Sequence, residues 1–279
     1  MLAETLEGLD VRPGAVIVDA TFGAGGHTSA LVAAGARVIA FDRDPDAELP
    51  QHLAASVVLV RRNFADIADA LDELDTPHID GALFDVGVSS MQFDRPERGF
   101  SLVADGPLDM RMNNAEGETA YDLLATSSEA ELADIFFHYG EERGARRIAR
   151  SIVAAREAGR LPESTLGLAK LVAGITHVSG KRERLHPATR VFQGLRIAVN
   201  DELGALERGL DAAIGRLRPG ARIAAISFHS LEDRIVKRRF RDDERVRPVT
   251  KKPLTAGAEE LARNPRARSA KLRVAERLA

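Results

Sequence analysis

Residues 16–27 read VIVDATFGAGGH, an apolar run that leads into a glycine-rich turn. The run Val16–Ala20 has the length and composition of a buried strand. The small residues that follow the turn, Thr28–Ala34, are compatible with a helix. A strand, a glycine turn and a helix in this order allow the backbone to approach a ligand closely. Residues 16–34 therefore predict one strand and one helix of an open α/β sheet, with a ligand at the turn.

The glycines match only part of the dinucleotide-binding pattern G-x-G-x-x-G. Gly23 and Gly25 fit it, but Thr28 stands where the third glycine belongs. The next apolar run, Arg37–Asp42, ends in an acid 17 residues after Gly25. A carboxylate near this spacing can accept hydrogen bonds from both ribose hydroxyls of a nucleoside. Two interpretations of Asp42 remain open: it binds a ribose, or it caps the segment that follows it.

Three more apolar runs continue the strand pattern. They are Val57–Val60, Ile79–Asp85 and Ala221–Ser227. Ligands of open α/β sheets bind beyond the carboxyl ends of the strands. Asp19, Asp42, Phe64 and Asp85 all stand at or near such ends, which predicts a shared ligand site. For Phe64, packing on a purine and ordinary core packing both remain open.

Between residue 100 and Ala221 the pattern becomes helical. The predicted helices follow a capping box at Ser128–Glu131, span Glu141–Ala158 and Ser164–Ile175, and run from His186 past Leu210. The last of them carries one continuous apolar stripe. The chain is therefore predicted to be an α/β sheet that is interrupted after its fourth strand by an all-helical insertion near the ligand crevice.

Basic residues gather in two regions. In the helix predicted over Glu141–Ala158, four arginines share one face: Arg143, Arg146, Arg147 and Arg150. Residues 234–279 carry 15 basic and 6 acidic side chains, although the whole chain has a formal net charge of -3. Both regions favour a polyanionic partner such as nucleic acid, and the alternative for each is a solvated face.

The sequence after the fifth strand is rich in polar groups. It reads FHSLED over residues 228–233. Ser230 is a candidate cap for the helix that follows. His229 with Glu232 and Asp233 raises the question of a metal site, but the two acids are adjacent and no second histidine lies at ligand spacing. We therefore predict no bound metal and interpret His229 as a hydrogen-bonding residue at the crevice.

The composition excludes several classes of protein. With 279 residues, 44% hydrophobic and 29% charged, the chain has the values of a globular protein rather than a disordered or collagen-like one. It has no cysteine, which excludes disulfides, thiolate metal sites and a cysteine nucleophile. No apolar run approaches the roughly 18 residues of a membrane helix, and residues 1–7 do not resemble a signal peptide. We expect a cytoplasmic protein with no membrane partner.

Several blocks of residues are recognisable together. Asp19–His27 resembles motif I of S-adenosylmethionine-dependent methyltransferases. More narrowly, the chain resembles the bacterial RsmH (MraW) family, which methylates N4 of a cytidine in small-subunit ribosomal RNA. The matching blocks are FDRDP (41–45), FDVGVSS (84–90), ERGFS (97–101), DGPLDMRM (105–112), HPATR (186–190), ISFHSLEDR (226–234) and NPRARS (264–269). They are spread, in order, over nearly the whole chain.

The resemblance implies a fold, a cofactor and a partner. The fold is a Rossmann-like class I methyltransferase sheet (residues 1–112 and 201–279) with an inserted all-helical substrate-recognition domain (113–200). The cofactor is S-adenosylmethionine, with S-adenosylhomocysteine as the product, and the partner is 16S ribosomal RNA in the small ribosomal subunit. Carried over position by position, the cofactor site falls on Gly25, Gly26, His27, Asp42, Phe64, Asp85 and Gln92.

The reaction implies a second set of residues. Asp85 is our candidate catalytic residue, as an acceptor for the amino protons of cytosine. The target base must leave its stack to reach the crevice, so the surrounding RNA has to be held. The candidate RNA-binding residues are Arg143, Arg146, Arg147, Arg150, Arg190, His229, Arg234 and Arg238.

Other functions remain as alternatives. A DNA cytosine-N4 methyltransferase would share the cofactor site, and a non-catalytic ribosome assembly factor would bind RNA through the basic tail. An NAD-dependent dehydrogenase is disfavoured by Thr28. The family usually begins with a further segment containing a His-x-Pro-Val-type motif, which does not occur here, and Met91 replaces its usual proline before Gln92. The sequence does not indicate an oligomeric state.

Overall fold

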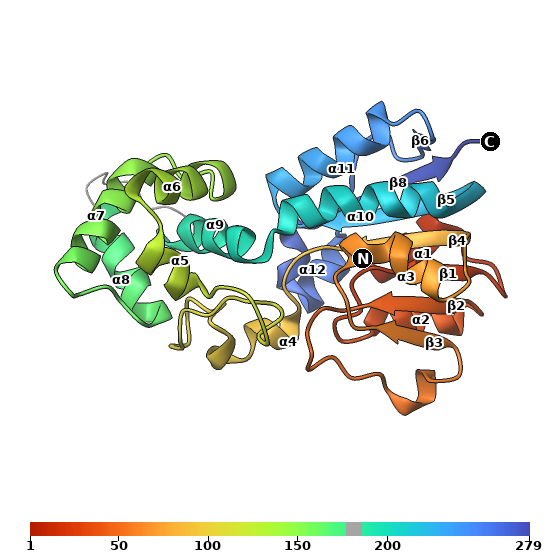
Figure 1. Cartoon of the computed structure of the whole chain (residues 1–279). Coiled ribbons are helices and arrows are strands. Elements are labelled where there is room, and N and C mark those ends of the chain that lie inside the picture. Colours follow the sequence, from red (N-terminus) through yellow and green to blue (C-terminus); the bar gives the residue numbers. More distant parts are fainter. Residues whose placement is uncertain (177–185) are drawn as a thin grey trace. The chain divides into compact units, whose positions relative to one another are not determined.

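The computed structural model describes residues 1–176 and 186–279, which divide into two compact units (Figure 1). The first unit consists of Met1–Gly87 and Leu203–Ala279, and the second of Val88–Glu202. The sequence predicts that the insertion begins at residue 113, but the second unit already begins at Val88. The reason is that Phe100 and Leu108 bury their side chains in the core of the helical unit.

The first unit is built around a mixed sheet. Its strands are β1 (Val16–Asp19), β2 (Arg37–Phe41), β3 (Val57–Val60), β4 (Ile79–Asp85), β5 (Leu217–Ser227), β6 (Val246–Pro248), β7 (Leu254–Thr255) and β8 (Lys271–Arg277). They lie in the order β3-β2-β1-β4-β5-β8-β6, with β7 paired to β8. Strands β1 to β5 are parallel, and β8 runs antiparallel to its neighbours. The Rossmann-like class predicted from the sequence is confirmed, and the order reverses at β1, which places a switch point at the carboxyl ends of β1 and β4.

Alternate residues of the central strands enter two different cores. Val18 of β1 and Phe84 of β4 are buried in one core, while their neighbours Ile17 and Leu83 are buried in the other. Strands that are covered on both faces consist of almost continuous apolar residues. This double burial explains why the apolar runs in the sequence locate β1, β2 and β4 almost to the residue.

Helices cover both faces of the sheet. They are α1 (Leu2–Leu9), α2 (Gly26–Ala33), α3 (Ile67–Glu73), α10 (Glu202–Arg216), α11 (Ser230–Asp242) and α12 (Ala258–Arg263), with 3-10 turns at Gln51–Leu53, Phe64–Asp66 and Pro265–Ser269. Helices α3, α10 and α11 contribute to the core that contains Phe84. Helices α1 and α2 contribute to the core that contains Leu83.

The second unit is helical and has its own core. It contains α4 (Ser90–Phe93), a 3-10 turn (Pro96–Arg98), α5 (Ala120–Thr126), α6 (Glu129–Asp134), a π-helical turn (Ile135–Tyr139), α7 (Ala145–Glu157), α8 (Thr165–Thr176) and α9 (Thr189–Asn200). Phe136, Ile148 and Leu195 are among its fully buried side chains. The capping box predicted at Ser128 is confirmed, because Ser128 and Glu131 exchange side-chain to backbone hydrogen bonds.

The long helix predicted from His186 past Leu210 is wrong, because two helices share that stretch. Helix α9 ends at Asn200, Asp201 adopts a left-handed conformation with φ 46°, and α10 begins at Glu202. The Asn200 amide donates to the carbonyls of Met110 (2.7 Å) and Arg196 (2.8 Å) and accepts from the Met112 amide (2.7 Å). Aspartate tolerates the left-handed region better than most residues. Tertiary hydrogen bonds at Asn200 therefore accompany the helix end, although the apolar stripe continues on both sides.

The helix predicted over Glu141–Ala158 also begins later than expected. Residues 141–144 form a turn, in which Glu141 has φ 51° and the Glu142 carboxylate accepts from the Gly144 amide at 2.6 Å. Helix α7 starts at Ala145, so Arg143 lies in the turn rather than on the helix face. Within the described residues, no helix is both long and apolar enough to span a bilayer.

Candidate active site

The turn after β1 has a backbone that only small residues adopt without strain. Gly23 and Gly25 have φ of 53° and 75°. A Cβ on Gly25 would lie 3.1 Å from the ring of Phe22, whereas one on Gly26 would meet no atom within 4 Å. Helix α2 begins at Gly26, and no side chain caps its N-terminus. The open side of the turn therefore presents backbone amides at the positive end of a helix, which suits an anionic group of a ligand.

Asp19 ties this turn to the helix. It is fully buried at the end of β1, accepts from the Thr28 hydroxyl at 2.6 Å and accepts from the Thr21 amide at 3.1 Å. Burial raises the pKa of the Asp19 carboxyl above its ordinary value. Thr28, which breaks the dinucleotide pattern in the sequence, thus has a structural role as the partner of Asp19.

Asp42 caps the segment that follows β2 and also contacts the glycine turn. One carboxylate oxygen accepts from the Asp44 amide and the other from the Gly23 amide, both at 2.9 Å. Burial raises the pKa of Asp42. The interpretation of Asp42 as a cap is confirmed by its hydrogen bond with the Asp44 amide. A carboxylate oxygen has more than one acceptor direction, so a ribose contact is compatible with it.

Asp85 and His27 face each other across the open side of the turn. His27 Nδ1 lies 3.4 Å from Asp85 Oδ2, and the Asp85 amide donates to the Thr21 hydroxyl at 2.8 Å. Burial alone would lower the pKa of His27, but the carboxylate of Asp85 outweighs burial and raises it. Asp85 Oδ1 is buried and has no hydrogen-bond partner among the described residues. A buried acceptor without a partner is costly, which makes this atom a candidate ligand contact.

Phe64 is partly buried and packs against the core of the first unit. Its ring packs edge-on against Phe84, with centroids 5.6 Å apart, and Gly209 of α10 sits against it so closely that a Cβ there would lie 2.6 Å from the ring. The core-packing interpretation of Phe64 is therefore observed. Its predicted contact with adenine stays a prediction.

Gln92 belongs to the second unit, so it is not placed with the residues above. It is buried, its side chain accepts from the Ser89 amide at 3.2 Å, and its own amide reaches the Met112 carbonyl at 3.5 Å. The first unit thus brings together five of the seven predicted cofactor residues: Gly25, Gly26, His27, Asp42 and Asp85.

The sequence as a whole matches the MraW methylase family over residues 1–278. The chain belongs to the MraW methylase family. It is 47% identical to "Ribosomal RNA small subunit methyltransferase H" of Magnetococcus marinus, over the whole chain and 97% of that protein. It is 50% identical to the protein of the same name from Geobacter sulfurreducens, with the same two coverages. The resemblance seen in the sequence blocks is confirmed.

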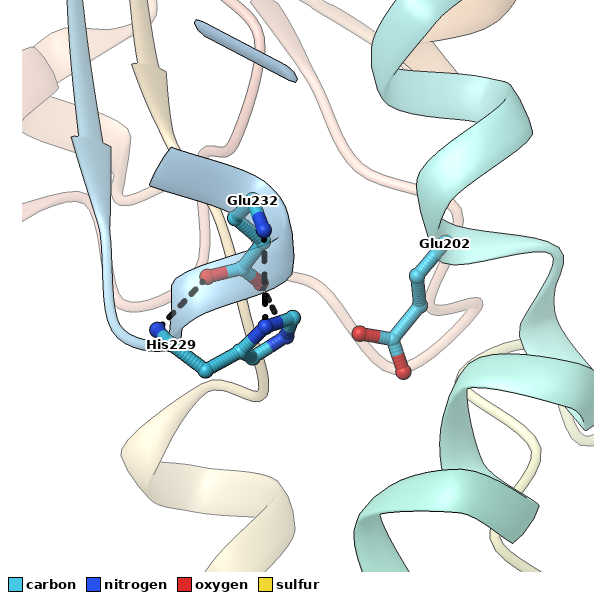
Figure 2. A group of neighbouring side chains, drawn as sticks. All are labelled: Glu202, His229 and Glu232. Carbon is cyan, nitrogen blue, oxygen red and sulfur yellow. Dashed lines mark hydrogen bonds and ion pairs between the residues drawn. The ribbon is translucent and has the colours of Figure 1, made fainter. Parts of the chain in front are cut away.

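His229 of this MraW methylase caps a helix. Figure 2 shows its ring at the first turn of α11, where Nδ1 accepts from the Glu232 amide at 3.5 Å. One Glu232 oxygen accepts from the amides of Phe228 (2.8 Å) and His229 (3.2 Å). His229 Nε2 is buried and makes no hydrogen bond among the described residues, although the other Glu232 oxygen lies 3.0 Å away. The prediction that Ser230 caps this helix is wrong, because His229 occupies the cap position.

Glu202, also drawn in Figure 2, is engaged within the second unit. Both of its carboxylate oxygens accept from the guanidinium of Arg196, at 2.8 and 2.9 Å. Such a two-pronged contact fixes both side chains more firmly than a single ion pair does. The last residue of this unit is therefore fixed to helix α9 by an ion pair, one residue after the break at Asp201.

The predicted RNA-binding arginines separate into groups. Arg143, Arg146 and Arg147 line one recess of the second unit, together with Phe137 and His138. The remaining arginines are exposed elsewhere: Arg150 on α7, Arg190 on α9, and Arg234 and Arg238 on α11. Arg150 pairs with Glu129 at 3.4 Å. The single arginine face predicted from the sequence is therefore only partly correct.

Much of the basic C-terminal segment is neutralised within the first unit. The Asp233 carboxylate accepts hydrogen bonds from Lys271 Nζ at 3.0 Å and from Arg273 Nε at 2.7 Å. Arg245 pairs with Asp243 and lowers the pKa of that carboxyl to about 2. Part of the positive charge counted in the sequence thus holds β8 and α11 in place, and is not free for a polyanion.

Sequence reasoning missed three groups of the site. Thr21 connects Asp19 and Asp85 by hydrogen bonds, and Thr28 donates to Asp19. Phe137 lines the recess that also contains Arg143, Arg146 and Arg147. A threonine two residues after a buried acid is a weak signal for Thr21, and Thr28 stands out only as the break in the glycine pattern. Phe137 gives no signal, because an aromatic residue in an apolar helix usually indicates core.

Proposed function

We propose that this chain transfers a methyl group from S-adenosylmethionine to the exocyclic N4 of a cytidine in 16S ribosomal RNA of the small subunit. The observation that carries the proposal is the pair His27–Asp85 at the glycine turn, with its buried, unpartnered Asp85 oxygen. The proposal is also supported by relatives that bear the name of a small-subunit ribosomal RNA methyltransferase.

The residues around the turn fit this cofactor. The amides after Gly25 suit the carboxylate of its methionine part, because α2 begins there without a side-chain cap. Asp42 has acceptor capacity for the ribose, and its contact with the Gly23 amide holds the turn open. Gln92 and Phe64 remain the proposed contacts to the rest of the cofactor. When bound, S-adenosylmethionine supplies a methyl group that its sulfonium charge activates.

Asp85 is proposed to act on the amino group of the target cytosine. The lone pair of N4 is delocalised into the ring, so the nitrogen is a weak nucleophile. When N4 takes the methyl group, the bond from that carbon to sulfur would break, S-adenosylhomocysteine would leave, and N4 must lose one proton. Asp85 Oδ1 is an unpaired acceptor, and His27 beside Oδ2 orients the carboxylate. The surrounding residues also lower the activation barrier by aligning the reactants. In favourable cases such alignment is worth about 7–11 kcal/mol.

The first test uses purified protein, radiolabelled S-adenosylmethionine and undermethylated small subunits. Label in N4-methylcytidine, or in its 2′-O-methylated form, is expected after digestion of the RNA. The Asp85→Asn variant should retain cofactor binding and lose about a hundredfold or more in turnover. Asp69→Asn, at an exposed position on α3, is the matched control and should behave as wild type.

Other results would favour the alternative functions. Label in duplex DNA but not in subunits would indicate a DNA cytosine-N4 methyltransferase. Cofactor binding without label in either substrate would contradict the proposed reaction. Absence of both cofactor binding and label, with retained binding to subunits, would favour a non-catalytic assembly factor.

A further inference from the structure

The second unit contains a recess that the methyl-transfer site does not use. It has a volume of about 660 Å³ and lies over α6, the π-helical turn and the start of α7. Its lining residues are Ala133, Asp134, Phe137, His138, Arg143, Gly144, Ala145, Arg146 and Arg147. We call it the arginine recess. All of these residues belong to the second unit, so its geometry is independent of the first.

The backbone around the arginine recess is firmly held. The π turn closes with a hydrogen bond from the Gly140 amide to the Ile135 carbonyl, at 3.3 Å. A Cβ on Gly140 would lie 2.4 Å from the Arg190 carbonyl and 2.6 Å from that of Phe136, so only glycine fits there. Single π turns inside helices are frequent at functional sites. The recess is therefore preformed, and a ligand need not order it.

The π turn places an aromatic ring at the surface. The Phe137 side chain is 56% exposed, whereas its neighbour Phe136 is fully buried in the core of the unit. The ring of His138 stands edge-on to it, with centroids 5.1 Å apart and planes at 82°. An exposed phenyl ring in a recess offers a flat apolar face on which a nucleobase can stack.

Another part of the recess lining is positively charged. Arg143, Arg146 and Arg147 are exposed, and among residues 1–176 and 186–279 none of them has an ion-pair partner. The lining contains a single acid, Asp134. The first turn of α7 also lies here, and its cap Gly144 provides no side-chain hydrogen bond. Unpaired guanidinium groups at a helix N-terminus are suited to phosphate.

We propose that the arginine recess binds one unstacked nucleotide of a single-stranded RNA segment, with the base on Phe137 and the phosphates on Arg143, Arg146 and Arg147. The inference rests on the proposed function in that the strand would belong to the ribosomal RNA substrate. A base can stack on a phenyl ring only when it has left its own helix, so the recess selects single strands over duplex. Free mononucleotides have the same chemistry, but they lack the neighbouring phosphates that three arginines can reach.

The test measures binding of a fluorescent single-stranded RNA hexamer to the full chain. Fluorescence anisotropy is recorded between 50 and 200 mM salt for wild type and variants, with a matched duplex and cytidine monophosphate as competitors. Phe137→Ala is expected to weaken hexamer binding about tenfold. Phe137→Tyr, which keeps an aromatic ring, is expected to bind the hexamer as wild type does. The triple variant Arg143→Ala/Arg146→Ala/Arg147→Ala should lower the salt slope by about 0.7 for each phosphate that the variant no longer neutralises.

Arg160→Ala is the control for loss of a positive charge, because Arg160 is exposed in the same unit and does not line the recess. It should leave hexamer affinity within about twofold of wild type. Phe137→Leu controls for apolar bulk, and it should weaken binding nearly as much as Phe137→Ala. Phe137 is exposed, so the midpoint of thermal unfolding should not change in either variant.

Several outcomes would overturn the inference. Equal affinity of wild type and Phe137→Ala would exclude stacking, and a triple variant no weaker than Arg160→Ala would exclude the phosphate contacts. Duplex that competes as well as hexamer would exclude an unstacked base. Cytidine monophosphate that competes as well as hexamer would indicate a free nucleotide site.

Cofactor binding and methyl transfer are measured in parallel, so that the two proposals are separable. If the variants lose hexamer binding but wild type transfers no methyl group, RNA binding by the recess is supported and the proposed function is contradicted. If wild type and all variants methylate subunits with the same KM, the proposed function stands and the recess fails.

Discussion

In the first unit the candidate site consists of backbone amides and short acids held by hydrogen bonds, whereas in the second unit the arginine recess consists of long, exposed side chains. Asp19 and Asp42 have each carboxylate oxygen engaged. Arg146 and Arg147 are exposed and unpaired among the described residues. The difference fits the two ligands we propose: a small cofactor requires fixed atoms, and a flexible strand requires charge and a stacking face.

Substitution of two glycines, one in each unit, should have the largest effects. Gly140 is required for packing, whereas Gly26 leaves open space beside the glycine turn. Gly140→Ala is expected to destabilise the second unit by about 3 kcal/mol, since its Cβ would overlap two backbone carbonyls that cannot move independently. Chemical denaturation, with hydrogen exchange resolved over residues 120–200, measures the effect. Gly174→Ala in α8 is the control, because a Cβ there meets nothing within 4 Å. Equal stability of the two variants would contradict the prediction.

Gly26→Ala should have the converse effect. A Cβ at this position meets no protein atom, so stability should change by less than about 0.5 kcal/mol. Cofactor affinity should fall about tenfold, or 1.4 kcal/mol, because the new methyl group would occupy the open side of the turn. Titration calorimetry with S-adenosylmethionine tests this, with Gly257→Ala as control. Unchanged affinity would place the cofactor elsewhere.

A smaller effect is expected from the pH dependence of His27. Because its pKa is raised in the folded state, its contribution to stability is complete below its ordinary value and is lost as the pH rises through the folded value. Between about pH 6 and 8, wild type should therefore lose stability relative to His27→Gln. Urea unfolding of both proteins across this range measures the difference, and parallel stability curves would contradict the prediction.

The smallest effect concerns Arg150, the arginine outside the recess. Its ion pair with Glu129 is at the surface, with side chains 74% and 43% exposed, and such pairs contribute about 0–1 kcal/mol. Arg150→Ala should shift stability by no more than about 0.5 kcal/mol, and less at high salt. A loss above 1 kcal/mol would mean that this arginine, unlike Arg146 and Arg147, is structural.

The sequence located β1, β2 and β4 because each is buried on both faces, and double burial leaves a continuous apolar run. It also placed Asp19, Asp42 and Asp85 at strand ends, where parallel topology alone brings them to one edge of the sheet. Family membership followed from blocks of identical residues, which need no geometry. Each of these properties depends on residue type and order along the chain, so the sequence is sufficient to predict them.

Tertiary structure alone decided the rest. The break between α9 and α10 accompanies hydrogen bonds of Asn200 to residues about ninety positions away. The exposure of Phe137 depends on a π turn that Gly140 allows by packing against α9. Phe64 packs on Phe84 and is partly buried there, with Gly209 of α10 against its ring. In each case the partner is distant in sequence, and a local pattern cannot contain an interaction that only the folded chain creates.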